Sequence, residues 1–332
     1  MKFSHIYDNQ SILKRDFYNL FEVLQYKNMQ WFFIALGAPF LWALVNIADQ
    51  YLVAKYSTGK RGSGGLVLFS SLIGILVATI IGISTTGIFA ISILDKILLI
   101  LIGGITIAWV ILYLFTLEIE DVSTVVPWFL TVPMFGYMLG YVFLRETLSP
   151  EQLTGSAIIL FGVFLISIDF SEQKKKLKWR PALYMLTACF LIAISGVIFK
   201  YITVGENFWI SSFWEYVGLG GFGILIYFFI PKYRNEFILM NKDGGSKIFT
   251  LNAISEILTI IGNLLTNYAI LLAPVAMVYL VSSFQPAIVV VLTLIATKFF
   301  PNIVKENLKK SVLLPKIIAI IIMVIGSAIL FL

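Results

Sequence analysis

Charged residues are scarce in this sequence. Only 13% of the 332 residues are Asp, Glu, Lys or Arg, whereas 59% are hydrophobic. A soluble globular domain carries about 25% charged residues, so this composition excludes an ordinary soluble domain. The mean hydropathy of +0.94 instead predicts an integral, multi-pass membrane protein, located in the cell membrane or, for a bacterial source, the inner membrane.

Cysteine and histidine are almost absent, which excludes several kinds of chemistry. The single cysteine, Cys189, lies in an apolar run and has no second cysteine for an intrachain disulfide. The single histidine, His5, lies in the polar N-terminal tail, so no imidazole is expected at membrane depth. Because a recognisable nucleophile motif is also lacking, we expect no enzyme activity, no cofactor and no metal site.

The positive charge does not form an extended basic face. The net charge is +6, but Lys and Arg lie in short connectors such as "QKKKLKWR" (173–180). This pattern favours anionic lipid head groups over nucleic acid as a partner. The sequence leaves a monomer and a homodimer open.

Long apolar runs dominate what the sequence does contain. About 20 apolar residues span a bilayer as a helix. Ten segments meet this length: 31–54, 65–85, 94–117, 122–144, 152–170, 180–203, 208–230, 247–272, 275–300 and 313–332. The expected fold is therefore an all-α polytopic membrane protein with ten transmembrane helices. Residues 1–30 show apolar spacings of three and four, which indicate an amphipathic interfacial helix or a tail helix packed on loops.

The two halves of the chain resemble each other. "VSTVVPWFLTVP" (122–133) aligns with "VAMVYLVSSFQP" (275–286), and "FLWALVNIADQY" (40–51) aligns with "FLIAISGVIFKY" (190–201). These matches predict a five-helix repeat at 31–170, a basic linker at 171–179 and a second repeat at 180–332. An odd number of helices per repeat places the two copies in opposite orientations. The aligned Pro133 and Pro286 predict helix kinks beside a central cavity, because proline frees a backbone carbonyl.

Residues 113–167, "YLFTLEIEDVSTVVPWFLTVPMFGYMLGYVFLRETLSPEQLTGSAIILFGVFLIS", resemble the EamA domain of the drug/metabolite transporter (DMT) superfamily. Pro133 and Glu146, the latter followed by a threonine-leucine corner, carry this resemblance. "NYAILLAPVAMVYLVSSFQPAIVVVLTLIA" (267–296) is similar to the second EamA copy, although Phe299 stands where the first copy has Glu146. The resemblance implies a ten-helix secondary transporter of small organic solutes, with two inverted repeats around a central cavity.

An acid lies within the segment 247–272. Asn252, Glu256, Thr259, Asn263 and Thr266 recur every three or four residues and form one polar stripe on a helix. A charge at the centre of a membrane span costs roughly 2.5–3.5 kcal/mol, so Glu256 is expected to serve a function. The alternative is a permanently protonated carboxyl group that bonds to a neighbouring helix.

Other polar and aromatic residues of the spans are weaker candidates for the cavity. Trp109, Tyr113 and Trp128 can form an aromatic wall for a flat or cationic ligand, or can pack in the core. Lys200 is expected to extend its ammonium group toward the bilayer surface rather than to pair with an acid. The predicted substrate or cavity residues are Glu256, Asn252, Asn263, Asn267, Tyr268, Glu215, Trp214, Trp42, Asn46, Trp109, Tyr113 and Trp128.

These observations predict a permease or exporter of a small organic metabolite that works by alternating access. An amino acid-like substrate and proton coupling are open possibilities. The alternatives are a multidrug or organic-cation exporter, a non-transporting assembly subunit and a membrane-embedded enzyme. Orientation also stays open, because seven of the 24 Lys and Arg residues lie on the side of the N-terminus. The positive-inside rule then places the termini outside, whereas the family resemblance implies cytoplasmic termini.

Overall fold

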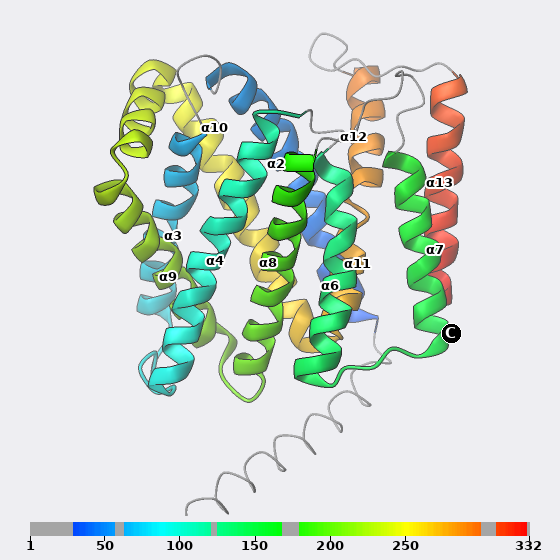
Figure 1. The fold of residues 1–332 in the computed structure, drawn as a ribbon, viewed down its shortest axis with the longest axis horizontal. Helices are drawn as coiled ribbons and strands as arrows, with labels where there is room; N and C mark the ends of the chain where they lie inside the picture. Colours follow the sequence, from blue (N-terminus) through cyan, green and yellow to red (C-terminus); the bar gives the residue numbers. More distant parts are fainter. Residues whose placement is uncertain (1–28, 57–62, 121–124, 168–178, 300–309, 331–332) are drawn as a thin grey trace, which may run out of the picture.

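The computed structural model describes residues 29–56, 63–120, 125–167, 179–299 and 310–330, which form helices and short turns with no strand among them. The predicted N-terminal segment (1–30) and basic linker (171–179) lie almost wholly outside these residues. The helices pack side by side in one bundle (Figure 1). They are α2 (Gln30–Tyr56), α3 (Gly64–Ser84), α4 (Ile93–Leu117), α6 (Thr131–Leu139), α7 (Pro150–Ser167), α8 (Trp179–Thr203), α9 (Phe208–Phe229), α10 (Pro231–Leu272), α11 (Val275–Ser282), α12 (Gln285–Phe299) and α13 (Lys310–Ile329).

Every expected apolar segment contains helix within the described residues. Six helical stretches are long and apolar enough to cross a membrane: 64–84, 93–117, 179–203, 208–229, 249–272 and 275–292. Four shorter apolar stretches lie at 30–46, 128–144, 150–165 and 317–329. The prediction of an all-helical membrane protein is therefore confirmed, and the ten-span arrangement remains a prediction.

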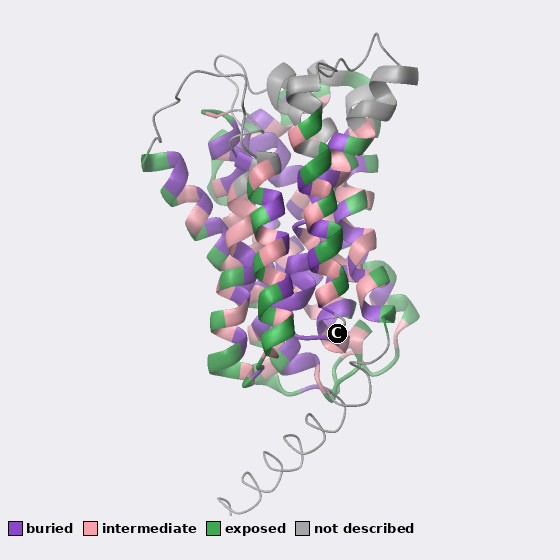
Figure 2. Ribbon diagram, turned by 90° about the vertical axis from the view of Figure 1, so that its right-hand side faces the viewer, coloured by how far each residue is buried: buried purple, intermediate pink, exposed green. Residues whose placement is uncertain are grey.

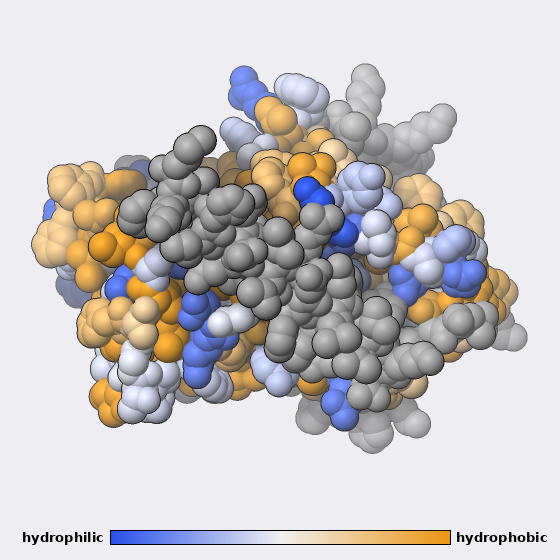
Figure 3. Space-filling model, turned by 90° about the horizontal axis from the view of Figure 1, so that it is seen from below, coloured by the Kyte–Doolittle hydropathy of each residue, from blue (hydrophilic) through white to orange (hydrophobic). Residues whose placement is uncertain are grey.

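The bundle exposes apolar side chains on its outer surface. Leu76 and Ile80, one turn apart on α3, are 58% and 59% exposed. Buried residues alternate with intermediate and exposed residues along each helix, as expected of helices with one side in a bundle and one side outside it (Figure 2). Seen from below, apolar residues reach the outline of the molecule, with hydrophilic side chains between them (Figure 3). Such an outer surface is suited to lipid rather than to water.

The longest helix contains a sharp break that the sequence analysis missed. We expected this helix to begin at 247, but α10 begins at Pro231. Gly245 has φ 62° and ψ −168°, a conformation that glycine adopts readily because it lacks a Cβ atom. Two helical arms therefore join here, and the Asn252 amide donates a hydrogen bond to the Met240 sulfur of the other arm at 3.8 Å.

The fourth segment of each half is interrupted next to its proline. In the first half, a 3₁₀ turn (Val126–Leu130) precedes α6, and Pro133 is the third residue of that helix. A π-helical turn (Gly140–Leu144) then follows α6. In the second half, α11 ends at Ser282 and α12 begins at Gln285, directly before Pro286. Both breaks follow from the missing N–H group and the ring of proline.

Most helix packing joins the first half of the chain to the second. The main pairs are α2 with α10, α3 with α9 and α10, α4 with α8 and α9, α6 with α8 and α11, and α7 with α13. The last pair lies at one edge of the bundle (right in Figure 1), with α3 and α9 at the opposite edge. A Cβ atom on Gly155 of α7 would lie 2.8 Å from the Gly326 carbonyl oxygen of α13, so these helices pack at backbone distance.

Candidate functional site

The polar stripe of α10 lies on the side of the helix that packs against α2, α3 and α9. Asn252 and Thr266, at its two ends, are 4% and 5% exposed. Glu256, near the middle, is partly buried and accepts a hydrogen bond from the Ser70 hydroxyl group of α3. The stripe therefore faces protein, as its spacing requires for polar groups within a membrane.

A second carboxylate meets the same side of α10. Glu215 of α9 accepts a hydrogen bond from the Asn267 amide of α10 at 2.8 Å. Asn267 lies eleven residues after Glu256, so the two positions are on nearly the same face, roughly 16 Å apart along the axis. Ser211, one turn before Glu215, is fully buried, and its hydroxyl group has no hydrogen-bond partner among the described residues.

Helix α2 contributes two of the predicted residues to this region. A Cβ atom on Gly262 of α10 would lie 2.6 Å from the Trp42 indole nitrogen, so Trp42 packs directly against the inward side of α10. Asn263, the next residue of the stripe, is partly buried. Asn46, one turn after Trp42, has a buried amide nitrogen with no hydrogen-bond partner among the described residues. An indole ring thus lies against the acid-bearing helix, with an amide group one turn further along α2.

The predicted aromatic wall lies in the core. Tyr113 of α4 is 7% exposed, and its ring centroid is 5.7 Å from that of Phe129. Trp109 and Trp128 are partly buried and pack against the main hydrophobic core. These residues join α4 to the start of the broken fourth segment, and core packing accounts for their positions.

Trp214 and Tyr268 also have structural contacts. The Trp214 indole N–H donates to the Ile88 carbonyl group at 2.7 Å, and its ring lies 5.6 Å from the Lys96 ammonium group. Trp214 thereby holds the turn between α3 and α4. Tyr268 is 43% exposed and packs edge-on against Phe208 at 5.5 Å.

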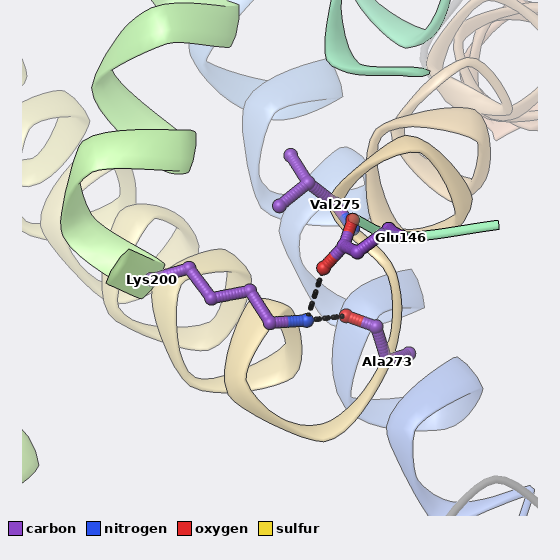
Figure 4. Close-up of polar contacts among 4 residues, drawn as sticks. All are labelled: Glu146, Lys200, Ala273 and Val275. Carbon is purple, nitrogen blue, oxygen red and sulfur yellow. Dashed lines mark hydrogen bonds and ion pairs between the residues drawn. The ribbon is translucent and has the colours of Figure 1, made fainter. Parts of the chain in front are cut away.

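A buried ion pair is the polar cluster that the sequence analysis missed (Figure 4). The Lys200 ammonium group lies 2.6 Å from the Glu146 carboxylate, and the two side chains are 4% and 3% exposed. The expectation that Lys200 extends toward the bilayer surface is therefore wrong. The sequence placed an acid and a lysine near the ends of two spans, but only helix packing brings the two together.

Backbone groups complete this pair. Val275 N–H, at the start of α11, donates to the second Glu146 oxygen at 2.9 Å. Lys200 also donates to the Ala273 carbonyl group at 2.8 Å, in the turn between α10 and α11. Arg145, with φ 56°, ends the π-helical turn and directs the chain into Glu146. The pair therefore joins the α6–α7 connection, the end of α8 and the α10–α11 turn.

Two more carboxylates, also missed, hold the start of α3 at the opposite end of the bundle. Glu118 accepts from Ser63 N–H at 2.6 Å, and Glu236 accepts from Gly64 N–H at 3.0 Å. A negative charge suits a helix N-terminus because unpaired N–H groups and the helix dipole point there. Burial, together with the charges of Glu236 and Glu118, raises the pKa of the nearby Tyr233.

Comparison with known proteins gives one family and one fold. Residues 29–168 match the model of the EamA-like transporter family. No curated protein matches the chain. A protein of known crystal structure, 13% identical in sequence, has a similar fold with a TM-score of 0.64, and the alignment covers 91% of this chain and 96% of the other. At that identity the likeness shows the fold alone, but it extends over both halves.

The apolar outer surface, the membrane-length helices and the family match together define an integral, multi-pass membrane protein. Its first half, residues 29–168, matches the EamA-like transporter family, which belongs to the drug/metabolite transporter superfamily. The resemblance seen in the sequence is thereby confirmed.

Proposed function

We propose that the protein is a secondary transporter of a small organic metabolite with a cationic nitrogen, which works by alternating access between two inverted five-helix repeats. The match of residues 29–168 to a transporter family supports the general activity. A proton is the second cation that the same site can carry.

The helix contacts support the inverted repeat. If α2, α3, α4 and α7 correspond to α8, α9, α10 and α13, exchange of the two halves maps the α4–α8 contact onto the α10–α2 contact. It also maps the α4–α9 contact onto α10–α3, and leaves α3–α9 and α7–α13 unchanged; all these contacts are present. A pseudo-twofold axis produces such a pattern, and transporters place substrate between repeats related in this way.

The observation that carries the substrate class is the pair Glu215–Asn267. Glu215 lies within a membrane-length helix, and its hydrogen-bond partner is a neutral amide. Among the described residues it forms no ion pair, whereas Glu146 has Lys200. An acid that is held inside a membrane protein without a cation must bind a proton or a cationic ligand, because a bare charge there is too costly.

Export of diverse organic cations is the second candidate function. It is favoured by Trp42, whose ring packs on Gly262 of the helix that carries Glu256 and Asn267. An indole face attracts quaternary or aromatic cations that a carboxylate alone does not select. Breadth of ligand tolerance distinguishes this candidate from a metabolite carrier.

A thermal-shift screen of the purified protein tests the proposal. Amino acids, nucleobases, sugars and organic cations are each added to wild type, Glu215→Gln and Glu256→Gln. Glu151→Gln, at an exposed residue at the start of α7, is the matched control. A ligand at a hundred times its dissociation constant adds about 2.7 kcal/mol to stability.

We expect one cationic class to stabilise wild type and the control, and Glu215→Gln to lose this response while it stays folded. The same class should then cross proteoliposome membranes in a flux assay. An undiminished response in Glu215→Gln would overturn the proposed site. Absence of any response or flux, with variants that differ only in stability, would favour a non-transporting assembly subunit, and chemical turnover of a ligand would favour an enzyme.

A further inference from the structure

We propose that the Glu146–Lys200 pair is a latch that holds one end of the bundle closed and that separates whenever this end opens. This end, the lower end in Figure 1, contains the α6–α7 connection, the α8–α9 turn and the α10–α11 turn. The inference rests on the alternating access of the proposed function, but it needs no knowledge of the substrate.

The pair crosses the boundary between the halves. Glu146 belongs to the first half, whereas Lys200, Ala273 and Val275 belong to the second. An outward movement of the α6–α7 connection from α8 and α11 must break the ion pair and the Val275 hydrogen bond together (Figure 4). Both carboxylate oxygens and the ammonium group are engaged, so the closed arrangement leaves neither charge unsolvated.

The latch is one-sided. Alignment of the two halves places Phe299 opposite Glu146 and Gln50 opposite Lys200, so the pseudo-equivalent positions cannot form an ion pair. At the upper end, one polar contact between the halves is the hydrogen bond from Gly64 N–H to the Glu236 carboxylate. Lys232, the basic partner of Glu236, is 73% exposed and 3.9 Å away. The two ends are thus closed by different chemistry, and the buried ion pair favours the state with the lower end closed.

Cysteine accessibility at the two ends tests the latch directly. Thr203→Cys and Ser63→Cys are near-isosteric probes, each at a residue that is 1% exposed, one turn after Lys200 and at the start of α3 respectively. Each probe is placed in a Cys189→Ala background, which removes the native, fully buried thiol. The rate of N-ethylmaleimide labelling is then measured in membranes.

The key variant is Glu146→Gln/Lys200→Met, which removes the pair without leaving one buried charge alone. We expect at least fivefold faster labelling at position 203, with unchanged or slower labelling at position 63. Lys200→Arg, which keeps the charge, should retain slow labelling. Lys232→Met, which removes an exposed charge, is the matched control and should change neither rate.

Labelling at position 203 within twofold of the parent rate, in a double variant that purifies as a folded monodisperse protein, would overturn the latch. If the double variant does not fold, Glu146→Asp serves instead, because the shorter side chain weakens the pair while both charges stay. It should accelerate labelling at position 203, and an unchanged rate would likewise overturn the latch. The proposed function has a separate test. If Glu215→Gln keeps the thermal-shift response to the ligand, the proposed site is overturned whatever the labelling rates at positions 203 and 63 are. Failure of the latch and failure of the proposed function are therefore distinguishable.

Discussion

Three acids within the bundle differ in the groups that meet them. Glu146 is paired with a lysine, Glu215 meets an amide and Glu256 accepts from a serine hydroxyl. The ion pair with Lys200 ties Glu146 to the second half of the chain. An amide donor stabilises charge less than a lysine does, as the proposed exchange of a proton or a cationic ligand at Glu215 requires.

Removal of one member of the ion pair should cost more stability than removal of both. Lys200→Met leaves a buried carboxylate with only the Val275 N–H group, and we expect a loss of about 3–5 kcal/mol. Glu146→Gln should be similar, because it leaves a buried ammonium group. The double variant Glu146→Gln/Lys200→Met should lose less than either single variant. Denaturation of the purified proteins measures the coupling, and additive losses would contradict a coupled pair.

Asn267→Asp should make stability depend on pH. The substitution puts a second carboxyl group at the 2.8 Å contact with Glu215, and two carboxylates at that distance share one proton. Their like charges repel each other in the folded protein, so the stability lost at neutral pH should return as the pH falls toward about 4, where both carboxyl groups are protonated. Unfolding temperatures at pH 7.5 and 4.5 measure the effect, with Asn267→Leu as the uncharged control. An equal deficit at both pH values would contradict it.

At the scale of elements, glycine residues allow helices α4 and α9 to pack at backbone distance. A Cβ atom on Gly218 would lie 2.2 Å from the Ile100 carbonyl oxygen, and one on Gly103 of α4 would lie 2.1 Å from the Leu219 nitrogen. These are backbone atoms, which cannot move aside as a flexible side chain can. The two helices therefore cross at a distance that excludes even one methyl group.

Gly218→Ala and Gly221→Ala should therefore have opposite effects. The first should destabilise the protein by about 1–3 kcal/mol, since the helices must separate to admit the methyl group. The second should be neutral or stabilising by up to about 1 kcal/mol, because nothing lies within 4 Å of the new atom and alanine favours helix. Thermal unfolding in one detergent compares them, and equal effects would show that the crossing tolerates more space.

At the scale of the whole molecule, the halves are packed into each other. Helix α2 contacts α10, α4 contacts α8 and α9, and α7 contacts α13. Each half thus leaves its inner surfaces uncovered without the other. The family match to residues 29–168 marks a unit of sequence, whereas the bundle needs both halves to bury its polar groups.

Expression of residues 1–172 alone should consequently give a protease-sensitive product. Coexpression with residues 173–332 should restore resistance, because the helix contacts between halves re-form without a covalent linker. Limited proteolysis in membranes measures this, with the intact chain as control. A resistant first half would mean that the repeats fold independently.

The sequence by itself determined the membrane class, the apolar segments, the positions of both proline breaks and the family. These features depend on local composition and spacing, which act within one helix. The polar stripe around Glu256 was likewise readable, since its period is that of a helix. The break at Gly245 was not, because an isolated glycine only permits this conformation and does not require it.

Only the tertiary structure decided which groups meet. Lys200 forms an ion pair with Glu146, the Asn267 amide donates a hydrogen bond to Glu215, and the Trp214 indole donates one to the Ile88 carbonyl group. Each of these contacts joins residues on different elements, so it depends on which helices are neighbours and how each is rotated about its axis. Those choices arise from packing across the whole bundle, where small residues such as Gly218 fix the approach of helices that are far apart in the chain.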